Sequence, residues 1–354
     1  MPVTVDPELI LLHLQTQEEE LVDLCGELVA IESPSPDPGA TRQMLDRLTK
    51  ELDQLKYRYR LSRPDNSGGY LYARPNHRRR HMPTQLLVGH VDTVWPLGTL
   101  AARPWLVEDG VAHGPGVFDM KAGIVQMLFA LRAVEELGLD PPAAPVVLFN
   151  TDEEIGSRES TTTIDRLSRI AARAFILEPG LGSTGALKTA RKGLAKYTVT
   201  VHGRAAHAGL DPEDGASAIL ELSSVIQRLF DLNDRQRDIT VNVGTIEGGI
   251  QANVVAPHSN AVVDVRVLNR EDAAQVDAAI RGLEPTTPGT SIDVTGGFGR
   301  PPMERTGRNE ALFEQARRIA AQLGMELHEV TAGGGSDGNT TQNRLCIQWR
   351  RGQG

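Results

Sequence analysis

The sequence has few cysteines and no long apolar run. Its two cysteines, Cys25 and Cys346, are far apart and lack metal-ligand spacing, which argues against a disulfide scaffold and against thiolate metal ligands. No segment approaches the ~20 apolar residues of a membrane span, and the amino-terminal segment lacks the basic start and apolar block of a secretion signal. We therefore expect a cytoplasmic protein with no membrane partner.

The sequence also lacks an excess of basic residues. Lys and Arg together number 37 against 46 Asp and Glu, which gives a net charge of −9. This balance argues against a general affinity for nucleic acid or anionic membranes and favours a small-molecule or peptide partner. The 354 residues exceed the ~250–300 at which a single core stops growing, so we expect two domains.

The first part of the sequence has the pattern of an α/β domain. Three short, continuously apolar runs at 85–89, 145–150 and 174–177 are typical of buried parallel strands. Helical periodicity predicts helices over 7–31, 41–55 and 120–138, the last with Asp119 at its N-cap. Helices between parallel strands indicate a mostly parallel sheet covered by helices.

From about Gly193 the pattern changes to alternating strands with an exposed face. The predicted order is β-α-β-β-α-β, the ferredoxin-like arrangement, with strands at 196–202, 239–246, 260–268 and 291–296 and helices at 215–232 and 271–283. We expect this α+β domain to be inserted into the first, with limits 1–192, 193–300 and 301–354. The last part contains a helix over 309–323, a short strand and the glycine-rich segment 331–339.

Each predicted parallel strand ends in metal-binding side chains. The first strand leads to His90 and Asp92, the second to Glu153 and Glu154, and the third to Glu178. The carboxyl ends of parallel strands meet at one edge of a sheet, so these residues should converge. His90 would be a ligand, and Asp92, two residues on, would hold the imidazole through its other nitrogen.

Asp119, at the start of the 120–138 helix, would add a fifth carboxylate to this group. Close carboxylates repel by roughly 4 kcal/mol per pair at an effective dielectric of about 20, so the group requires cations. Two divalent ions would balance it and would acidify water from a pKa of ~15.7 toward ~7, as in two-metal hydrolases. Histidine with carboxylates favours zinc, with cobalt or manganese as substitutes.

Each of these motifs alone has a simpler reading. An Asp at a helix start is usually only a cap, and the Glu153–Glu154 pair is typical of a solvated turn. Their joint placement at strand ends is what favours a metal site. Seven other histidines have no such context: His13, His77, His81, His113, His202, His258 and His328.

The motifs GHVDTV, GPGVFDMKAG, NTDEEIGS, LEPG, GRAAHAG and GGGSDGN, in this order, resemble the M20 family of dinuclear zinc peptidases and deacylases, particularly the glutamate carboxypeptidase branch. The resemblance extends from Leu28 to Asn339. It implies a zinc-peptidase catalytic domain and a smaller lid domain through which family members commonly form homodimers.

The resemblance also implies roles for individual residues. His90 and Glu178 would bind one zinc ion, Asp119 would bridge the two ions, and Glu154 would bind the second. Glu153 would be the general base, which takes a proton from water and passes it to the leaving amine.

Further roles fall on the predicted lid and on the glycine-rich segment. His207 resembles the histidine that family members place over the substrate carbonyl, often from the partner subunit, although a surface turn is the alternative. Asn253 and Arg300 match positions used for the terminal carboxylate of the substrate. Gly334 and Gly335 would bring backbone N–H groups close to the substrate, with a plain loop as the alternative.

The sequence departs from the family at its end. The last histidine is His328, before the glycine-rich loop, whereas the family's second zinc takes a histidine after it. The segment 340–354 also shows neither the apolar run nor the helical period of the family's final strand and helix. We expect a truncated or frameshifted carboxyl end and a weakened second zinc site.

Three hypotheses follow. The first is metal-dependent hydrolysis of an amide bond next to a C-terminal carboxylate, as in glutamate carboxypeptidases. The second, in the same class, is an N-acyl amino acid deacylase of the acetylornithine or succinyl-diaminopimelate type. The third is an inactive chain that acts only as a binding or dimerisation module.

Overall fold

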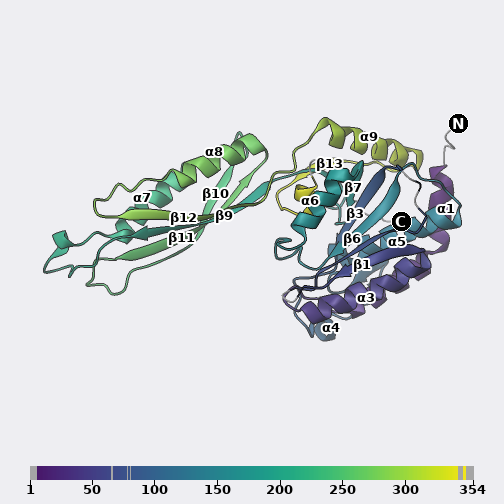
Figure 1. The fold of residues 1–354 in the computed structure, drawn as a ribbon, viewed down its shortest axis with the longest axis horizontal. Helices are drawn as coiled ribbons and strands as arrows, with labels where there is room; N and C mark the ends of the chain where they lie inside the picture. Colours follow the sequence, from purple (N-terminus) through teal and green to yellow (C-terminus); the bar gives the residue numbers. More distant parts are fainter. Residues whose placement is uncertain (1–5, 65–66, 78, 80, 342–345, 348–354) are drawn as a thin grey trace. The chain divides into compact units, whose positions relative to one another are not determined.

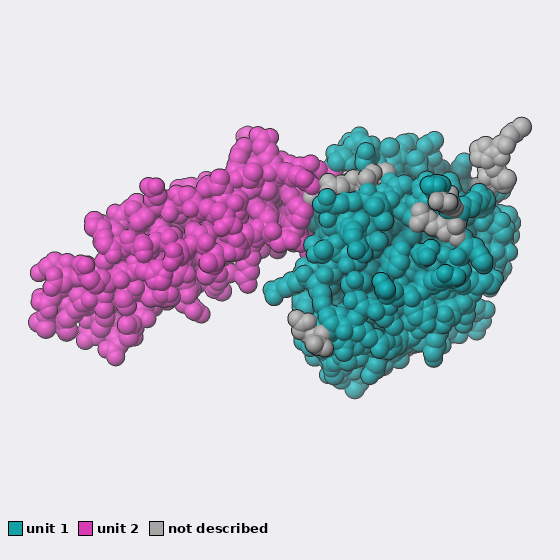
Figure 2. All heavy atoms as spheres, viewed as in Figure 1, with its two compact units in different colours: residues 1–189, 305–331, 336–354 teal, residues 190–304, 332–335 magenta. Residues whose placement is uncertain are grey.

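A computed structural model describes residues 6–64, 67–77, 79, 81–341 and 346–347. The chain forms two compact units, which Figure 2 colours separately. Unit 1 comprises residues 1–189, 305–331 and 336–354, and unit 2 comprises residues 190–304 and 332–335. The loop 332–335 therefore belongs with the inserted unit, whereas the sequence places it in the last part of the first domain. Its carbonyls accept hydrogen bonds from Arg191 and Arg266 of unit 2.

Unit 1 is built on a six-stranded sheet in the order β1-β2-β6-β3-β7-β14. Strands β6, β3 and β7 lie side by side in the sheet and are parallel, as the three apolar runs predict (Figure 1). Their bounds, with those of the neighbouring strands, are β1 Tyr57–Ser62, β2 Tyr70–Pro75, β3 Thr84–His90, β6 Ala144–Asn150, β7 Arg173–Ile176 and β14 Cys346–Ile347.

Helices pack on this sheet through their apolar faces. Helices α2, α3 and α5 share one buried cluster with the sheet, to which they contribute Leu28, Leu48 and Leu128 among others. The helical segments of unit 1 are α1 Pro7–Thr16, α2 Glu18–Ala30, α3 Pro38–Gln54, α4 Thr99–Ala102, η1 Val117–Lys121, α5 Ala122–Glu136, α6 Thr161–Ile170, α9 Gly307–Gln322 and α10 Asp337–Thr340. A small sheet of β4 Leu106–Glu108 and β5 Val111–His113 completes unit 1. A second small sheet pairs β8 Leu187–Arg191 with β13 Glu329–Ala332, and both of these strands begin in unit 1 and end in unit 2.

Two sequence predictions for unit 1 are wrong in detail. The first predicted helix is interrupted at Gln17, which separates α1 from α2. Asp119 is not the N-cap of α5, because Lys121 occupies that position. Asp119 instead lies inside the short turn η1 with non-helical angles (φ −124°, ψ 99°), and a cis peptide bond joins it to Met120.

The carboxyl-terminal segment also differs from expectation. The sequence predicts no counterpart of a final strand, but Cys346 and Ile347 pair in parallel with Ala174 and Phe175 of β7. Two residues are enough to extend the ladder of an open sheet edge, and they are too few to produce a detectable sequence period. The rest of the expectation for this segment concerns residues 342–345 and 348–354, which lie outside the described part of the chain.

Unit 2 has the predicted ferredoxin-like fold. Its antiparallel strands are β9 Gly193–His202, β10 Thr240–Gly248, β11 His258–Val267 and β12 Ser291–Arg300, in the order β10-β11-β9-β12. Its helical segments are α7 Ala218–Phe230, α8 Arg270–Arg281 and the short η2 Pro212–Asp214. A separate apolar cluster lies between the sheet and α7 and α8, and it includes Tyr197, Val199, Val225, Val263 and Ile280. Among the described residues, no helix is long and apolar enough to span a membrane.

Candidate metal centre

The ends of the three adjacent parallel strands carry the predicted ligands. His90 is the last residue of β3 and lies opposite Asn150, the last residue of β6. Glu153 and Glu154 follow β6 after two residues, and Glu178 follows β7 after one residue. The carboxyl ends of these strands form one edge of the sheet, which is where α/β proteins bind ligands.

The structure brings the predicted ligands into two overlapping groups. His90, Asp119 and Glu154 have ligand atoms within 4.8 Å of one another, and so do His90, Glu153 and Glu178. The Nε2 atom of His90 lies 3.1 Å from Oδ1 of Asp119. Glu153 therefore lies in a potential ligand group with His90 and Glu178, although the family resemblance gives it the role of base.

Asp92 lies beneath this cluster and is completely buried. Its Oδ1 atom is 3.4 Å from Nδ1 of His90. The same carboxylate accepts hydrogen bonds from the backbone N–H groups of Glu153 (3.2 Å) and Glu154 (3.1 Å), and from the Ser35 hydroxyl (2.8 Å). Asp92 thus contacts both the imidazole and the turn that carries the two glutamates. The sequence predicts the contact with the imidazole but not the contact with the turn.

The carboxylates of the cluster affect one another's protonation. The pKa of Glu154 is raised to about 7, chiefly by burial; the charge of His90 opposes the rise, and the charges of Asp119, Asp92 and Glu178 add to it. Burial alone would lower the pKa of His90, but hydrogen bonds to Asp119 and Asp92 and the nearby charges hold it well above its usual value. Both groups therefore bind a proton more readily in this cluster than the free side chains do, Glu154 mainly because it is buried and His90 because acids surround it.

This donor set suits a hard or borderline divalent cation. One imidazole nitrogen and several carboxylate oxygens converge, with no thiolate among the described residues of the cluster. Lys188 adds one buried positive charge, since its Nζ lies 3.7 Å from Oε2 of Glu178. A single ammonium group leaves most of the negative charge of the cluster uncompensated, so the residues fit a metal-binding role.

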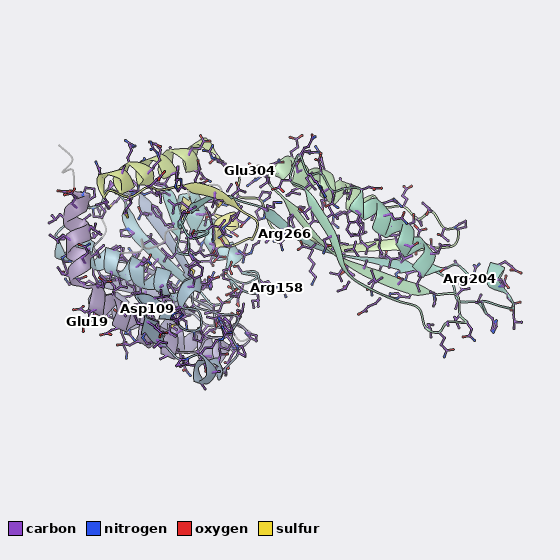
Figure 3. The ribbon with its side chains drawn as sticks, turned by 180° about the vertical axis from the view of Figure 1, so that it is seen from behind. Glu19, Asp109, Arg158, Arg204, Arg266 and Glu304 are labelled. Atoms are coloured by element: carbon purple, nitrogen blue, oxygen red, sulfur yellow. The ribbon has the colours of Figure 1, made fainter. Side chains whose placement is uncertain are left out.

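His207 and Asn253 lie together in unit 2, beyond the last residue of β9. His207 forms an isolated bridge with Val254, and the carbonyl of Asn253 accepts a hydrogen bond from the backbone of Ala208. Both side chains are exposed. Figure 3 labels Arg204, which starts this segment, at one end of unit 2.

Arg300, Gly334 and Gly335 lie at the other end of unit 2. Arg300 is the buried last residue of β12, and a Cβ atom added to Gly335 would lie 2.9 Å from Cδ of Arg300. The carbonyl of Gly334 accepts a hydrogen bond from Arg191 at 2.7 Å. Arg266, labelled near this end in Figure 3, pairs with Asp264.

The two groups of lid residues are separated by the length of β9. Arg300 pairs with Leu194 near the start of the strand, whereas His202 ends it. At about 3.3 Å per residue, these positions are roughly 26 Å apart, and the ladder runs on from His202 toward His207. One unit 2 therefore does not bring Asn253 and Arg300 together.

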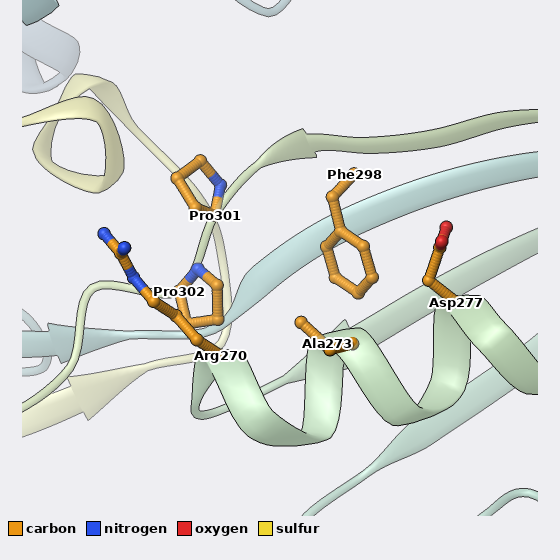
Figure 4. Close-up of a pocket in the computed structure, with 7 residues that line it drawn as sticks. Arg270, Ala273, Asp277, Phe298, Pro301 and Pro302 are labelled. Carbon is orange, nitrogen blue, oxygen red and sulfur yellow. The ribbon is translucent and has the colours of Figure 1, made fainter.

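Unit 2 also contains a hollow of about 500 Å³, shown in Figure 4. It lies between α8 and the end of β12 and is lined by Arg270, Ala273, Ala274, Asp277, Phe298, Pro301 and Pro302. None of these residues belongs to the predicted site. The candidate centre is thus the acidic cluster of unit 1.

Comparisons with known proteins relate the chain to M20 peptidases. Residues 189–283 match the family model for the M20 peptidase dimerisation domain. Carboxypeptidase G2 of Pseudomonas sp. is 32% identical over 258 residues, which cover 71% of this chain and 61% of that protein. The chain is therefore similar to M20 peptidases over most of its length. It spans 61% of the length of this relative.

Solved structures of peptidases share the fold. The aminopeptidase PepT of Bacillus cereus superposes with a TM-score of 0.77 at 25% identity, over 94% of this chain and 89% of that chain. An M20 family metallo-carboxypeptidase of Sulfolobus solfataricus superposes with a TM-score of 0.69 at 16% identity, over 94% of this chain and 90% of that chain. These matches support the α/β catalytic fold with an inserted lid.

Three residues beside the candidate metal centre were not found from the sequence. Ser35 donates to Asp92, Lys188 faces Glu178, and Asp337 binds the segment after Glu154 through Ser157. Lys188 lies in a strand without a motif, so no sequence signal marked it. Asp337 lies within the glycine-rich motif GGGSDGN, which was read only for its glycines.

Proposed function

We propose that this chain catalyses the metal-dependent hydrolysis of an amide bond next to a C-terminal carboxylate. The observation that carries the proposal is the convergence of His90 with Asp119 and Glu154 on one side and with Glu153 and Glu178 on the other. The similarity to carboxypeptidase G2 supports a carboxypeptidase over the other peptidase types among the structural relatives.

The metal would be held by His90, Asp119, Glu154 and Glu178. Zinc suits this donor set, and cobalt or manganese would substitute for it. When bound, such an ion supplies Lewis acidity, which polarises a carbonyl oxygen and acidifies water. The remaining His90 nitrogen is oriented by Asp92, which lies within contact distance of Nδ1.

Glu153 would be the general base. Its side chain is 9% exposed and lies within the ligand group of His90 and Glu178. A carboxylate in this position accepts a proton from water at one oxygen and donates it to the leaving amine. Asp92 fixes the backbone of Glu153 by accepting its N–H group.

Substrate recognition would involve both ends of unit 2, in a homodimer. Arg300 would bind the terminal carboxylate, with Gly334 and Gly335 beside it, because guanidinium pairs bidentately with carboxylate. His207 and Asn253 would reach the site of a second copy. The match to a dimerisation domain and the separation of these residues along β9 support this arrangement.

Metal analysis combined with a hydrolysis assay tests the proposed function. The purified protein should contain zinc and should release glutamate from an N-acyl-glutamate or folyl-type substrate. His90→Gln should lose both metal and activity, because it removes a ligand shared by both groups. A folded protein without metal or turnover would contradict the proposal and leave the binding-module hypothesis.

A substrate panel separates carboxypeptidase from deacylase activity. N-acetylornithine and N-succinyl-diaminopimelate should be poor substrates relative to N-acyl-glutamates. The reverse preference would assign the chain to the deacylases.

We also propose that units 1 and 2 act as the catalytic and lid domains of a cytoplasmic enzyme.

A further inference from the structure

Asp337 is a buried acid that the proposed mechanism does not use. It is the first residue of α10 and is 1% exposed. The preceding Ser336 and the following Asn339 form a capping box that fixes the start of this short helix. The glycine-rich segment therefore holds the Asp337 carboxylate in a defined place inside unit 1.

The Asp337 carboxylate joins two parts of the metal-bearing segment. One oxygen accepts a hydrogen bond from the hydroxyl of Ser157. The other accepts a hydrogen bond of 2.6 Å from Nδ2 of Asn150, the last residue of β6. All three residues are buried, and hydrogen bonds to a buried charged acceptor are stronger than those between neutral groups.

The two donors enclose the pair of acidic residues in the sequence. Asn150 precedes Glu153 and Glu154, and Ser157 follows them. The turn between is closed by hydrogen bonds from Ser157 N to Asp152 O (2.6 Å) and from Gly156 N to Glu153 O (2.9 Å). The turn is thus anchored at both ends to one carboxylate from a distant part of the chain.

Ser157 requires such an anchor. Its backbone has φ +51°, a left-handed conformation that residues with a side chain rarely adopt. Strained conformations of this kind persist where surrounding contacts determine them. The contact from Asp337 lies directly on this residue.

We propose that Asp337 is a positioning residue, which fixes the turn 152–157 and thereby holds Glu153 and Glu154 in their place beside His90. The inference that Asp337 affects metal binding rests on the proposed function, whereas the inference that it fixes the turn does not. Asp337 itself touches neither metal nor substrate in this role and acts through Ser157 and Asn150.

Hydrogen exchange of the metal-free protein tests the contact itself. Asp337→Asn and Ser157→Ala should each speed amide exchange in the peptide covering 150–160 by about tenfold or more. Asp272→Asn removes another buried acid, in unit 2, and should leave this peptide unchanged. Unchanged exchange in Ser157→Ala, which removes only one hydroxyl, would overturn the proposal even if Asp337→Asn failed to fold.

Cobalt binding tests the positioning role. The Co²⁺ dissociation constant, followed by the visible absorption of the ion, should rise about 10- to 100-fold in either single variant. The double variant should bind no more weakly than the weaker single variant, because both act through one contact. The positioning role would be overturned by a parent-like Co²⁺ dissociation constant in the single variants. It would also be overturned if the effects of the two substitutions multiplied in the double variant, or if Asp272→Asn weakened Co²⁺ binding equally. A parent that binds no Co²⁺ would contradict the proposed function, and hydrogen exchange would still decide the contact.

Discussion

Glu153 has two possible roles at this site, as a metal ligand or as the general base. It is buried within the ligand group of His90 and Glu178, so it is placed to bind metal or to move a proton. Glu153→Gln keeps the shape of the side chain and removes its basicity. As a base, Glu153 would contribute about 10²- to 10⁴-fold to turnover, so kcat should fall by that factor while metal content stays constant.

Metal analysis of Glu153→Gln distinguishes the roles. Loss of metal together with activity would make Glu153 a ligand and would refute its assignment as base. The exposed Glu108 in β4 provides the control. Glu108→Gln should retain parent kcat and parent metal content.

Glu221 has a purely structural role in unit 2. This buried carboxylate of α7 accepts hydrogen bonds from the backbone N–H groups of Thr286 (3.0 Å) and Thr287 (2.6 Å) and from the Thr286 hydroxyl (3.0 Å). Burial alone would raise the pKa of Glu221, but these hydrogen bonds outweigh it and hold the pKa below its usual value. The carboxylate therefore ties α7 to the segment before β12.

We expect Glu221→Gln to destabilise the protein by about 1.5–3 kcal/mol at pH 7, because hydrogen bonds to a charged acceptor are lost. The pKa of the folded state is lowered, so the stabilisation is present above the unfolded pKa and disappears as the pH falls through the folded pKa. Urea denaturation at pH 7 and below pH 4 measures this difference. The exposed Glu284→Gln is the control, and an equal effect of both variants would contradict the assignment.

At the scale of elements, the close approach of α5 to the end of β7 depends on Gly123. A Cβ atom at this position would lie 1.8 Å from the carbonyl oxygen of Leu177, the residue before Glu178. A backbone atom cannot move away as a side chain can. The glycine therefore sets the distance between the helix and a strand end that carries a ligand.

Gly123→Ala should lower the free energy of unfolding by about 1–3 kcal/mol, although alanine favours a helix by about 1 kcal/mol. Metal content should fall as well, because Leu177 leads directly to Glu178. Gly307, the first residue of α9, has no atom within 4 Å of its added Cβ. Gly307→Ala should be neutral or stabilising, and a similar result for Gly123→Ala in urea denaturation would exclude the steric argument.

Sequence reasoning found the elements whose signal is local. The apolar runs at 85–89, 145–150 and 174–177 became adjacent parallel strands, because continuous apolar residues are required where both faces of a sheet are covered. The same rule placed His90, Glu153 and Glu178 at one edge. The ferredoxin-like order was also readable, since its alternating strands each have one buried face.

Features set by tertiary contacts were missed. The sequence predicts a helix cap at Asp119, because the departure of this turn from helical angles has no compositional signal. Lys188 and Asp337 reach the site across 10 and 180 residues, from Glu178 and Ser157 respectively. No local pattern encodes such pairings. Strand β1 was also not predicted, although Tyr57, Tyr59 and Leu61 alternate with polar residues and give the period of two that is typical of a strand.

At the scale of the whole molecule, each unit has its own apolar core. The proposed metal ligands all lie in unit 1, and His207 and Asn253 lie at one end of unit 2. The assignment of these two residues to a partner's site has a consequence for mixed dimers. Two subunits with different inactivating substitutions would complement each other if the site combines residues from both copies.

We expect co-expressed His207→Ala and Glu153→Gln chains to regain activity that neither variant has alone. In a mixed dimer, the site with intact Glu153 would receive intact His207 from the other copy. Random pairing makes half of the dimers mixed, with one active site of two, so about one quarter of parent activity should return. Purification with a different tag on each chain isolates the mixed dimer, which should have about half of parent activity. If His207 served the site of its own chain, both sites of the mixed dimer would stay inactive. Co-expressed His207→Ala and Asn253→Ala chains are the control: because both residues lie at the same end of unit 2, each site of the mixed dimer would lack one of them.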